Sequence, residues 1–279
     1  MNLIFSINKK CIPFLFSCVC SILENGGYEH YHAYVLHSDL EEESQESIMN
    51  FFSEIDWHFI TVPKEMFEGF PVTKRYPEQI YYRLAAPLLL PKELERALYL
   101  DVDTIVIHPL RELYESDFED SWLMASTHTK SFLTWFNQVR LEIPTEDGVP
   151  YVNTGVLLMN LNELRKVTNI DEIRNIAKEK KNRLWLPDQD ILTCLYGKKT
   201  KLIDPLIYNI NDRVICIHNT SNNEKIDEEW VKENAVIVHY FGKNKPWRVG
   251  YEGVLGECYY EIAVKLKDRL DQYSSQQSR

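Results

Sequence analysis

Short apolar runs alternate with longer amphipathic stretches through the first hundred residues. The runs of strand length are residues 2–7, 32–36, 57–62 and 97–100, and the stretches of helix length between them include residues 12–24 and 44–52. Strand, helix, strand, helix, strand is the order of a parallel sheet with helices on both faces. The pattern predicts an α/β fold whose functional side chains lie at the carboxyl ends of the strands.

The pattern continues less regularly through the rest of the chain. Further strands are predicted at residues 122–126, 155–160 and 235–240, and further helices at residues 79–90, 132–139, 171–181 and 259–270. The polar stretch at residues 205–234 is predicted to be irregular. We expect a single domain over residues 1–262, followed at residues 263–279 by the end of a helix and a frayed tail.

One stretch imitates a targeting signal. Residues 11–23 carry no charge and follow Lys9 and Lys10, as in the apolar part of a signal peptide. However, a strand-like run precedes the lysines, where a signal peptide should begin, and the stretch is too short to cross a bilayer. We therefore predict a first strand followed by a buried helix, and no transmembrane segment.

Composition narrows the class of protein. The 279 residues are 44% apolar and carry a net charge of -11, which argues against a nucleic-acid partner. The six cysteines are scattered without a Cys-x-x-Cys pair, which favours reduced thiols in a cytoplasmic protein over disulfides or a zinc site. The C-terminal end is only modestly basic, so peripheral membrane contact has no support from the sequence.

The run at residues 97–100 ends in Asp101-Val102-Asp103. Because side chains alternate along an extended backbone, Asp101 and Asp103 point to the same side. Two carboxylates held this close favour a cation between them, and their oxygens suit a hard divalent metal ion. His239 ends a later strand and is the natural third ligand; a mixed oxygen and nitrogen set favours Mn²⁺, with Mg²⁺ as the alternative. An ordinary acidic turn and a core histidine are the competing interpretations.

Four patches in this order resemble glycosyltransferase family 8. They are residues 98–103 (LYLDVD), 153–160 (NTGVLLMN), 188–192 (DQDIL) and 239–247 (HYFGKNKPW), and Tyr82-Arg83 also fits. The resemblance extends over roughly residues 2–262. It implies a GT-A fold, with a Rossmann-like and mostly parallel mixed sheet flanked by helices. It also implies a UDP-sugar donor, a Mn²⁺-type metal ion and transfer with retention at the anomeric carbon.

The family includes bacterial lipopolysaccharide galactosyl- and glucosyltransferases and glycogenin. The resemblance therefore leaves galactose and glucose both open as the donated hexose, and it implies a saccharide or glycolipid acceptor. Binding of the donor is assigned by resemblance to the following residues: Ser6, Asn8, Arg83, Asp101, Val102, Asn153, Thr154, Asp188, Gly242 and Lys245. Of these, Lys245 is expected to meet the diphosphate as a point charge, and Gly242 to let the backbone approach a phosphate.

Asp188 and Gln189 are the catalytic candidates. By resemblance, Asp188 contacts sugar hydroxyls and Gln189 lies near the anomeric carbon. Retention needs either a carboxylate nucleophile or attack from the same face. Because an amide is a poor nucleophile, same-face attack is favoured, with the leaving phosphate taking the acceptor proton. A covalent intermediate on Asp188 is the alternative.

Several of these residues also have a plain structural explanation. Arg83 can pair with a nearby acid such as Glu78, and Asp188 can cap a helix. Asn153 can satisfy backbone groups where a strand begins, and Lys245 can be a solvated surface charge.

Two positions depart from the family pattern. Where the family usually has an acidic residue and a stacking aromatic ring, this chain has Asn8 and Cys11. Asn8 can pair with a uracil edge, but Cys11 cannot stack. Where an aspartate often meets sugars, the chain has Thr127 and His128. The grip on the base and the choice of sugar are therefore expected to differ from the family's.

Two other functions compete with transfer. A haloacid-dehalogenase-type phosphatase would use Asp101 as its nucleophile, but that motif normally ends the first strand of its fold, and here about a hundred residues precede it. A non-catalytic relative that binds nucleotide sugars is the second alternative, in view of Asn8 and Cys11.

Overall fold

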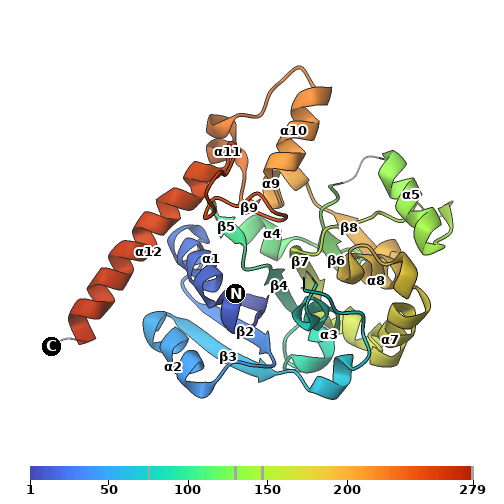
Figure 1. Cartoon of the computed structure of the whole chain (residues 1–279), viewed down its shortest axis with the longest axis horizontal. Helices are drawn as coiled ribbons and strands as arrows, with labels where there is room; N and C mark the ends of the chain where they lie inside the picture. The colour runs from blue at the N-terminus through green and yellow to red at the C-terminus, as the bar shows by residue number, and fades with distance from the viewer. Residues whose placement is uncertain (75, 129–130, 146–147, 278–279) are drawn as a thin grey trace.

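A computed structural model describes residues 1–74, 76–128, 131–145 and 148–277. Its centre is a seven-stranded sheet in the order β3-β2-β1-β4-β7-β6-β8 (Figure 1). The strands are β1 (Asn2–Ser6), β2 (Tyr31–His37), β3 (Ile55–Thr61), β4 (Arg96–Leu100), β6 (Leu123–Ala125), β7 (Val156–Asn160) and β8 (Thr200–Leu202). Strands β1 to β4 are parallel, β7 is antiparallel to β4 and β6, and β8 is parallel to β6. The predicted mixed and mostly parallel α/β sheet is confirmed.

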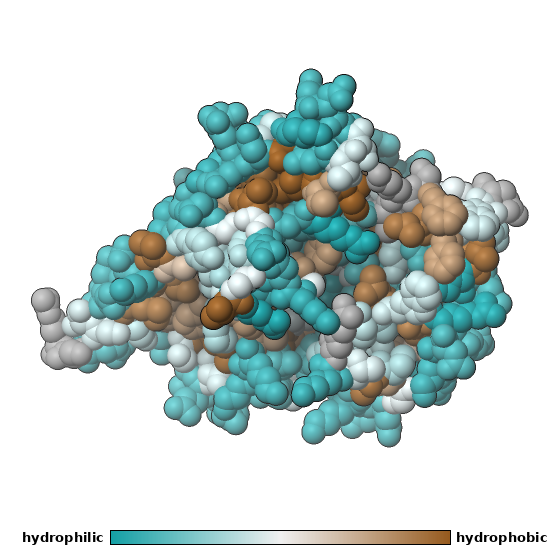
Figure 2. All heavy atoms as spheres, turned by 45° about the horizontal axis from the view of Figure 1, so that its top comes forward, coloured by the Kyte–Doolittle hydropathy of each residue, from teal (hydrophilic) through white to brown (hydrophobic). Residues whose placement is uncertain are grey.

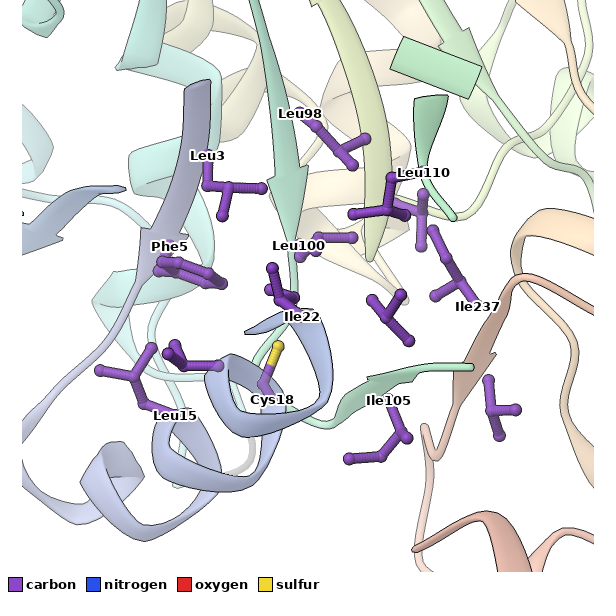
Figure 3. Packing of buried hydrophobic residues seen from close by; sticks show 14 of the residues in the cluster. Leu3, Phe5, Leu15, Cys18, Ile22, Leu98, Leu100, Ile105, Leu110 and Ile237 are labelled. Carbon is purple, nitrogen blue, oxygen red and sulfur yellow. The ribbon is translucent and has the colours of Figure 1, made fainter. Parts of the chain in front are cut away.

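Helices cover both faces of this sheet, because successive residues of each strand point to opposite sides. The first face packs against α1 (Ile12–Asn25), α2 (Glu42–Phe51) and α12 (Gly256–Gln277). The second face packs against α3 (Tyr82–Leu89), α6 (Leu161–Val167), α7 (Ile170–Glu179) and α8 (Pro187–Tyr196). Figure 3 shows the first core, where Leu3 and Phe5 of β1 and Leu100 of β4 lie beside Cys18 and Ile22 of α1. The uncharged stretch near the N-terminus is thus a buried helix, as predicted.

The polar stretch at residues 205–234 was predicted to be irregular, and this is wrong. It contains α9 (Pro205–Tyr208), α10 (Asp212–Ser221) and α11 (Glu228–Asn234). Asp204, Asn211 and Asp227 begin these helices, and each side chain accepts a hydrogen bond from a backbone amide of the first turn. Short helices with polar surfaces show little hydrophobic period, so the capping residues were the available signal.

The remaining helices are α4 (Arg111–Glu115) and α5 (Ser131–Leu141), and short 3-10 helices span Lys9–Cys11, Lys64–Phe67, Glu78–Tyr81, Lys181–Arg183 and Gly197–Lys199. Helix α12 continues to Gln277, where fraying was expected, because Leu266 and Tyr273 pack on the first core and Arg269 pairs with Glu54. Residues 278–279 lie outside the described part. Among the described helices, none combines the length and the apolarity needed to cross a bilayer. Each of the six cysteines is a free thiol.

A second, two-stranded sheet lies beside the end of β4. It pairs β5 (Thr104–Val106) antiparallel with β9 (Ile237–His239). In this register Thr104 lies opposite His239, and the Tyr240 amide donates to the Asp103 carbonyl oxygen at 2.9 Å. The small sheet therefore carries a segment from the far end of the chain to the turn that follows β4.

Candidate active site

The Asp101-Val102-Asp103 turn lies at the carboxyl end of β4, the edge of the sheet where the parallel strands end. The Asp101 amide donates to the Gly155 carbonyl oxygen at 2.8 Å, and the Asp101 carbonyl oxygen accepts from the Thr104 amide at 3.1 Å. Both carboxylates are about a quarter exposed, at 27% for Asp101 and 25% for Asp103. The turn is thus fixed by backbone hydrogen bonds while its carboxylates stay accessible.

The three predicted metal ligands come together in space. His239 Nε2 lies 3.2 Å from Asp103 Oδ1 and 3.8 Å from Asp101 Oδ2. One ligand atom from each residue lies within 4.8 Å of the other two. Two carboxylates and one imidazole at this spacing fit a single divalent ion. That they bind one remains a prediction.

A chain of hydrogen bonds fixes the orientation of the His239 ring. Asn153 Oδ1 accepts from the Gly155 amide at 3.0 Å and from Asn209 Nδ2 at 3.0 Å. Asn209 must therefore present its Oδ1 to His239 Nδ1, 2.8 Å away, so Nδ1 donates and Nε2 keeps its lone pair. Nε2 is buried and makes no hydrogen bond with any residue that the structure describes. Such an unpartnered nitrogen, aimed at two carboxylates, is what a metal ligand requires.

Gly155 has a steric role in this arrangement. A Cβ atom at this position would overlap the His239 ring. Gly155 belongs to the family patch at residues 153–160, but the sequence alone gives no role for it. Asn209 was missed altogether, because it lies in the stretch that was predicted to be irregular.

Arg83 connects the Asp-x-Asp turn to the catalytic candidates. Its guanidinium bonds Asp101 Oδ1 at 2.8 Å and the Thr154 carbonyl oxygen at 2.7 Å, and it lies 3.4 Å from Asp188 Oδ2. The alternative pairing with Glu78 is wrong, because Glu78 accepts a hydrogen bond from the Tyr82 hydroxyl instead. The buried guanidinium thus brings two carboxylates of the predicted site to one cation.

Asp188 is buried at the start of α8. Its carboxylate accepts from Thr154 Oγ1 at 2.6 Å, and burial raises its pKa, although Arg83 acts in the opposite direction. The N-cap position of α8 is Leu186, which makes no side-chain capping bond, and Asp190 accepts from the amides of Trp185 and Leu186 before the helix at 2.6 and 3.1 Å. Asp188 is thereby available to the site.

Asp190 fixes the segment that precedes α8. Its buried carboxylate pairs with Arg140 and accepts from the Tyr151 hydroxyl at 2.8 Å. Gln189, the second catalytic candidate, lies half-buried between Asp188 and Asp190. Contacts of Asp188 and Asp190 therefore fix the first turn of α8, which carries Gln189.

Lys245 is not a solvated surface charge. Its ammonium group is buried and bonds Asp103 Oδ2 and the Tyr240 carbonyl oxygen. Burial raises the pKa of Asp103, and the neighbouring ammonium of Lys245 acts in the opposite direction. Gly242, between His239 and Lys245, has φ of +89°, a left-handed conformation that favours glycine.

The remaining predicted donor residues lie at the ends of β1 and β4. Ser6 is the last residue of β1, and Val102 separates the two aspartates. Asn8 uses its Oδ1 locally, accepting from the Lys10 amide at 3.0 Å and lying 3.4 Å from Cys11 Sγ. The side-chain oxygen of Asn8 therefore already accepts from the 3-10 helix at Lys9–Cys11.

His128, at the position where the family often has an aspartate, contacts the cluster of Asp101, Asp103 and His239 indirectly, through Asn209. Its Nε2 lies 2.9 Å from the Asn209 carbonyl oxygen, and its ring stacks on Phe241 with 5.2 Å between centroids. Burial lowers the pKa of His128 to about 3, so this imidazole is neutral. It contacts the asparagine that orients His239.

Comparison with known proteins identifies the family of this chain. The model of glycosyl transferase family 8 matches residues 2–249. A putative glycosyltransferase of Haemophilus influenzae is 29% identical over 250 residues, covering 88% of this chain and 73% of that protein. A lipopolysaccharide 1,2-glucosyltransferase of Escherichia coli is 26% identical over 243 residues, covering 82% and 68%.

A solved structure shows the same fold. It is the galactosyltransferase LgtC in complex with donor and acceptor sugar analogs, with a TM-score of 0.78 and 24% identity over 95% of this chain and 96% of that one. Enzymes of this family and fold generally depend on a divalent metal ion. The chain is therefore a member of glycosyltransferase family 8, a glycosyltransferase with the GT-A fold.

Proposed function

We propose that the enzyme moves galactose or glucose from a UDP-sugar to a saccharide or glycolipid acceptor, with retention at the anomeric carbon. The acceptor class follows from relatives that are named lipopolysaccharide 1,2-glucosyltransferase and 1,3-galactosyltransferase. The free thiols support a cytoplasmic place of action.

One observation carries the proposal: His239 Nε2 is buried without a hydrogen bond to any described residue, and it faces Asp101 and Asp103. An unpaired buried nitrogen is costly unless a ligand satisfies it. The mixed donor set suits Mn²⁺, with Mg²⁺ as a weaker alternative because it prefers oxygen. An ion held there would supply positive charge beside the leaving diphosphate.

The chain's own cations supplement that charge. Lys245 already pairs with Asp103, and a shift of its flexible side chain toward the donor would bring an ammonium to the phosphate. Arg83 holds Asp101 and Asp188 in place through a planar, buried guanidinium. Preorganised charges of this kind stabilise negative charge as it develops in the transition state.

The contacts of Asp188 support same-face attack. Its carboxylate is engaged by Thr154 Oγ1 at 2.6 Å and Arg83 Nη1 at 3.4 Å, which suits a group that positions sugar hydroxyls. In this route the acceptor hydroxyl attacks the anomeric carbon from the side of the departing UDP, whose phosphate oxygen takes the proton. Trapping a glycosyl-enzyme on Asp188 would contradict this route and establish the covalent one.

An exposed apolar patch includes Trp185, just before the helix that carries Asp188 and Gln189, and is a candidate acceptor surface. Figure 2 shows apolar side chains gathered on the side where Figure 1 places α5. Its exposed members are Phe132, Leu133, Trp135, Phe136, Val139 and Trp185. The rings of Phe136 and Trp185 are 5.5 Å apart, and Trp185 lies just before Asp188 in the chain. Exposed patches of this kind mark interaction surfaces.

The test is hydrolysis of UDP-galactose and UDP-glucose with Mn²⁺ or Mg²⁺, comparing the wild type with Asp103→Ala. We expect metal-dependent hydrolysis that falls by about 10²–10³-fold in the variant, the range for losing a group that stabilises transition-state charge. Asp120→Ala, which removes an exposed acid near β6, is the control and should be fully active. Activity indifferent to Asp103→Ala would contradict the proposal.

The two rival functions have different outcomes. The hypothesis of a haloacid-dehalogenase-type phosphatase is wrong, because the family and fold are those of a glycosyltransferase. In addition, Asp101 follows the fourth strand of the chain. A non-catalytic relative would bind UDP-sugars without any turnover, even of water. Binding without hydrolysis in the panel above would establish that alternative.

A further inference from the structure

A second cluster of metal-type ligands lies on the edge strand of the sheet and its neighbour, in a region that the proposed transfer reaction does not use. It consists of His32 on β2 and Asp56 and His58 on β3. The parallel register pairs His32 with Asp56, and His58 follows Asp56 by two residues, so all three side chains point to the same face. The strand pattern itself therefore gathers them.

The three side chains meet at one carboxylate oxygen. Asp56 Oδ2 lies 2.8 Å from His32 Nδ1 and 3.2 Å from His58 Nε2. One ligand atom from each residue lies within 4.8 Å of the other two. Zinc–nitrogen and zinc–oxygen bonds are about 2.0–2.2 Å long, so ligand atoms at these separations reach a common ion after small side-chain rotations.

The scaffold around the cluster restricts the imidazoles. The Tyr34 ring is buried and stacks on His58, with 4.6 Å between centroids and 10° between planes. Strands β2 and β3 are paired without interruption from Tyr31 to His37. Ligands carried by paired strands are positioned more accurately than ligands on loops. Their side chains are 44%, 59% and 39% exposed, which leaves coordination positions open to water.

We propose that His32, Asp56 and His58 form a binding site for a Zn²⁺-type transition-metal ion that joins edge strand β3 to β2. Two imidazoles and one carboxylate with open positions suit Zn²⁺, Co²⁺, Ni²⁺ or Cu²⁺ rather than Mg²⁺ or Ca²⁺, which prefer oxygen ligands. Asp101, Asp103 and His239, called the donor cluster below, offer two carboxylates and one imidazole, a set that suits Mn²⁺. The two clusters are therefore expected to select different ions.

His32, Asp56 and His58 are called the edge cluster below, and their position indicates a structural role. His32 is level with residue 97 of β4, four residues before Asp101, so it lies about 13 Å from the donor site along the strand direction. An ion that binds the folded chain and not the unfolded chain stabilises the fold in proportion to its occupancy. Here it would hold the outermost strand, which has a neighbour on one side only.

The experiment uses Zn²⁺ and Co²⁺ as probes. Because the donor cluster can also bind these ions, titrations are made in an Asp103→Asn background as well as in the wild type. His32→Ala and His58→Ala each remove one imidazole, and Asp56→Asn removes the carboxylate charge while keeping the side-chain volume. His30→Ala, an exposed histidine just before β2, is the matched control.

In the Asp103→Asn background we expect a Zn²⁺ site that is weakened tenfold or more by each cluster variant and unchanged by His30→Ala, and the wild type should show the same site beside any Zn²⁺ bound at the donor cluster. Co²⁺ should give a visible absorption band that His58→Ala abolishes, and Zn²⁺ should raise the thermal midpoint of the wild type more than that of His58→Ala. Transfer activity in Mn²⁺ should be unchanged, which separates this proposal from the proposed function. If, in the Asp103→Asn background, His58→Ala leaves the Zn²⁺ affinity unchanged, the proposal is overturned, and the cluster consists of polar groups that prevent strand pairing at the edge.

Discussion

The fold contains two clusters of three histidine and aspartate side chains, and the clusters differ in position and burial. Asp101, Asp103 and His239 lie at the carboxyl ends of the strands, and His239 is 2% exposed. His32, Asp56 and His58 lie near the start of β2 and β3, with every side chain more than a third exposed. Position in the sheet and burial, rather than the presence of ligands, distinguish a candidate reaction centre from a candidate structural site.

Orientation is the second difference. The donor cluster is supported by Asn209 and Asn153, which determine which His239 nitrogen keeps its lone pair. In the edge cluster both imidazoles contact the ligand Asp56 itself. An imidazole whose second nitrogen is fixed by a hydrogen bond is a better oriented ligand. The comparison predicts that the donor cluster depends on residues outside it, whereas the edge cluster depends mainly on its own three members.

Gly155→Ala should have the largest effect. The added Cβ would overlap the His239 ring and displace the third ligand. We expect Mn²⁺-dependent hydrolysis of the UDP-sugar to fall by about 10²–10³-fold. Circular dichroism and a Zn²⁺ titration of the edge cluster would show whether the sheet is intact. A folded variant with wild-type activity would show that His239 has no role in the reaction.

Arg83→Lys should come next. Lysine keeps the positive charge but loses the planar fork that bonds Asp101 and Thr154 and approaches Asp188. We expect kcat/KM for the UDP-sugar to fall by about 10²-fold, the lower end for losing a transition-state contact.

The matched control for that change is Arg165→Lys. Arg165 also uses its guanidinium as a fork, bonding the Leu94 and Pro91 carbonyl oxygens at 2.7 and 2.6 Å, but it does so on α6. It should leave kcat/KM unchanged. Equal losses in the two variants would indicate a general loss of stability rather than a role for Arg83 at the donor.

Asn209→Ala should have a smaller effect, since it removes support and no ligand. The His239 ring loses the acceptor at Nδ1, and we expect Mn²⁺ affinity to fall by about 10–100-fold. High Mn²⁺ concentrations should then restore much of the activity. Asn219→Ala, which removes two side-chain hydrogen bonds to the Ile226 backbone in the same region of the chain, is the control. If Mn²⁺ affinity is unaffected by Asn209→Ala, the hydrogen-bonded chain does not orient the ligand.

His58→Ala should have the smallest effect on transfer. The edge cluster lies away from the donor site, so kcat/KM in Mn²⁺ should stay within about twofold of the wild type, a free-energy change below about 0.5 kcal/mol. A steady-state assay at saturating Mn²⁺ measures this. A large loss of activity would contradict the separation of the two clusters.

The pattern of apolar runs predicts the N-terminal half of the fold, where strands and helices alternate regularly along the chain. Strands β1 to β4 each have a clear apolar run, so the sequence predicts the end of β4 and the Asp101–Asp103 pair that follows it. His239 could be assigned because it ends the last apolar run. These inferences depend on sequence-local patterns that tertiary packing did not override.

Contacts between distant segments could not be predicted from such patterns. Asn209 reaches Asn153 across 56 positions of the chain, and nothing local marks it as a partner of His239. The choice of Asp190 rather than Asp188 to bond the amides before α8 also depends on packing. So does the burial of Lys245 against Asp103, since a lysine in a polar loop has no local signal for burial.

The most direct test of the central claim is a Mn²⁺ titration followed by electron paramagnetic resonance, comparing the wild type with Asp103→Asn and with His239→Gln. The account predicts one Mn²⁺ site in the wild type, with affinity at least about tenfold weaker in each variant because each loses one of three ligands. Wild-type affinity in His239→Gln would contradict the account, because the imidazole that converges on the two carboxylates would then not be a ligand.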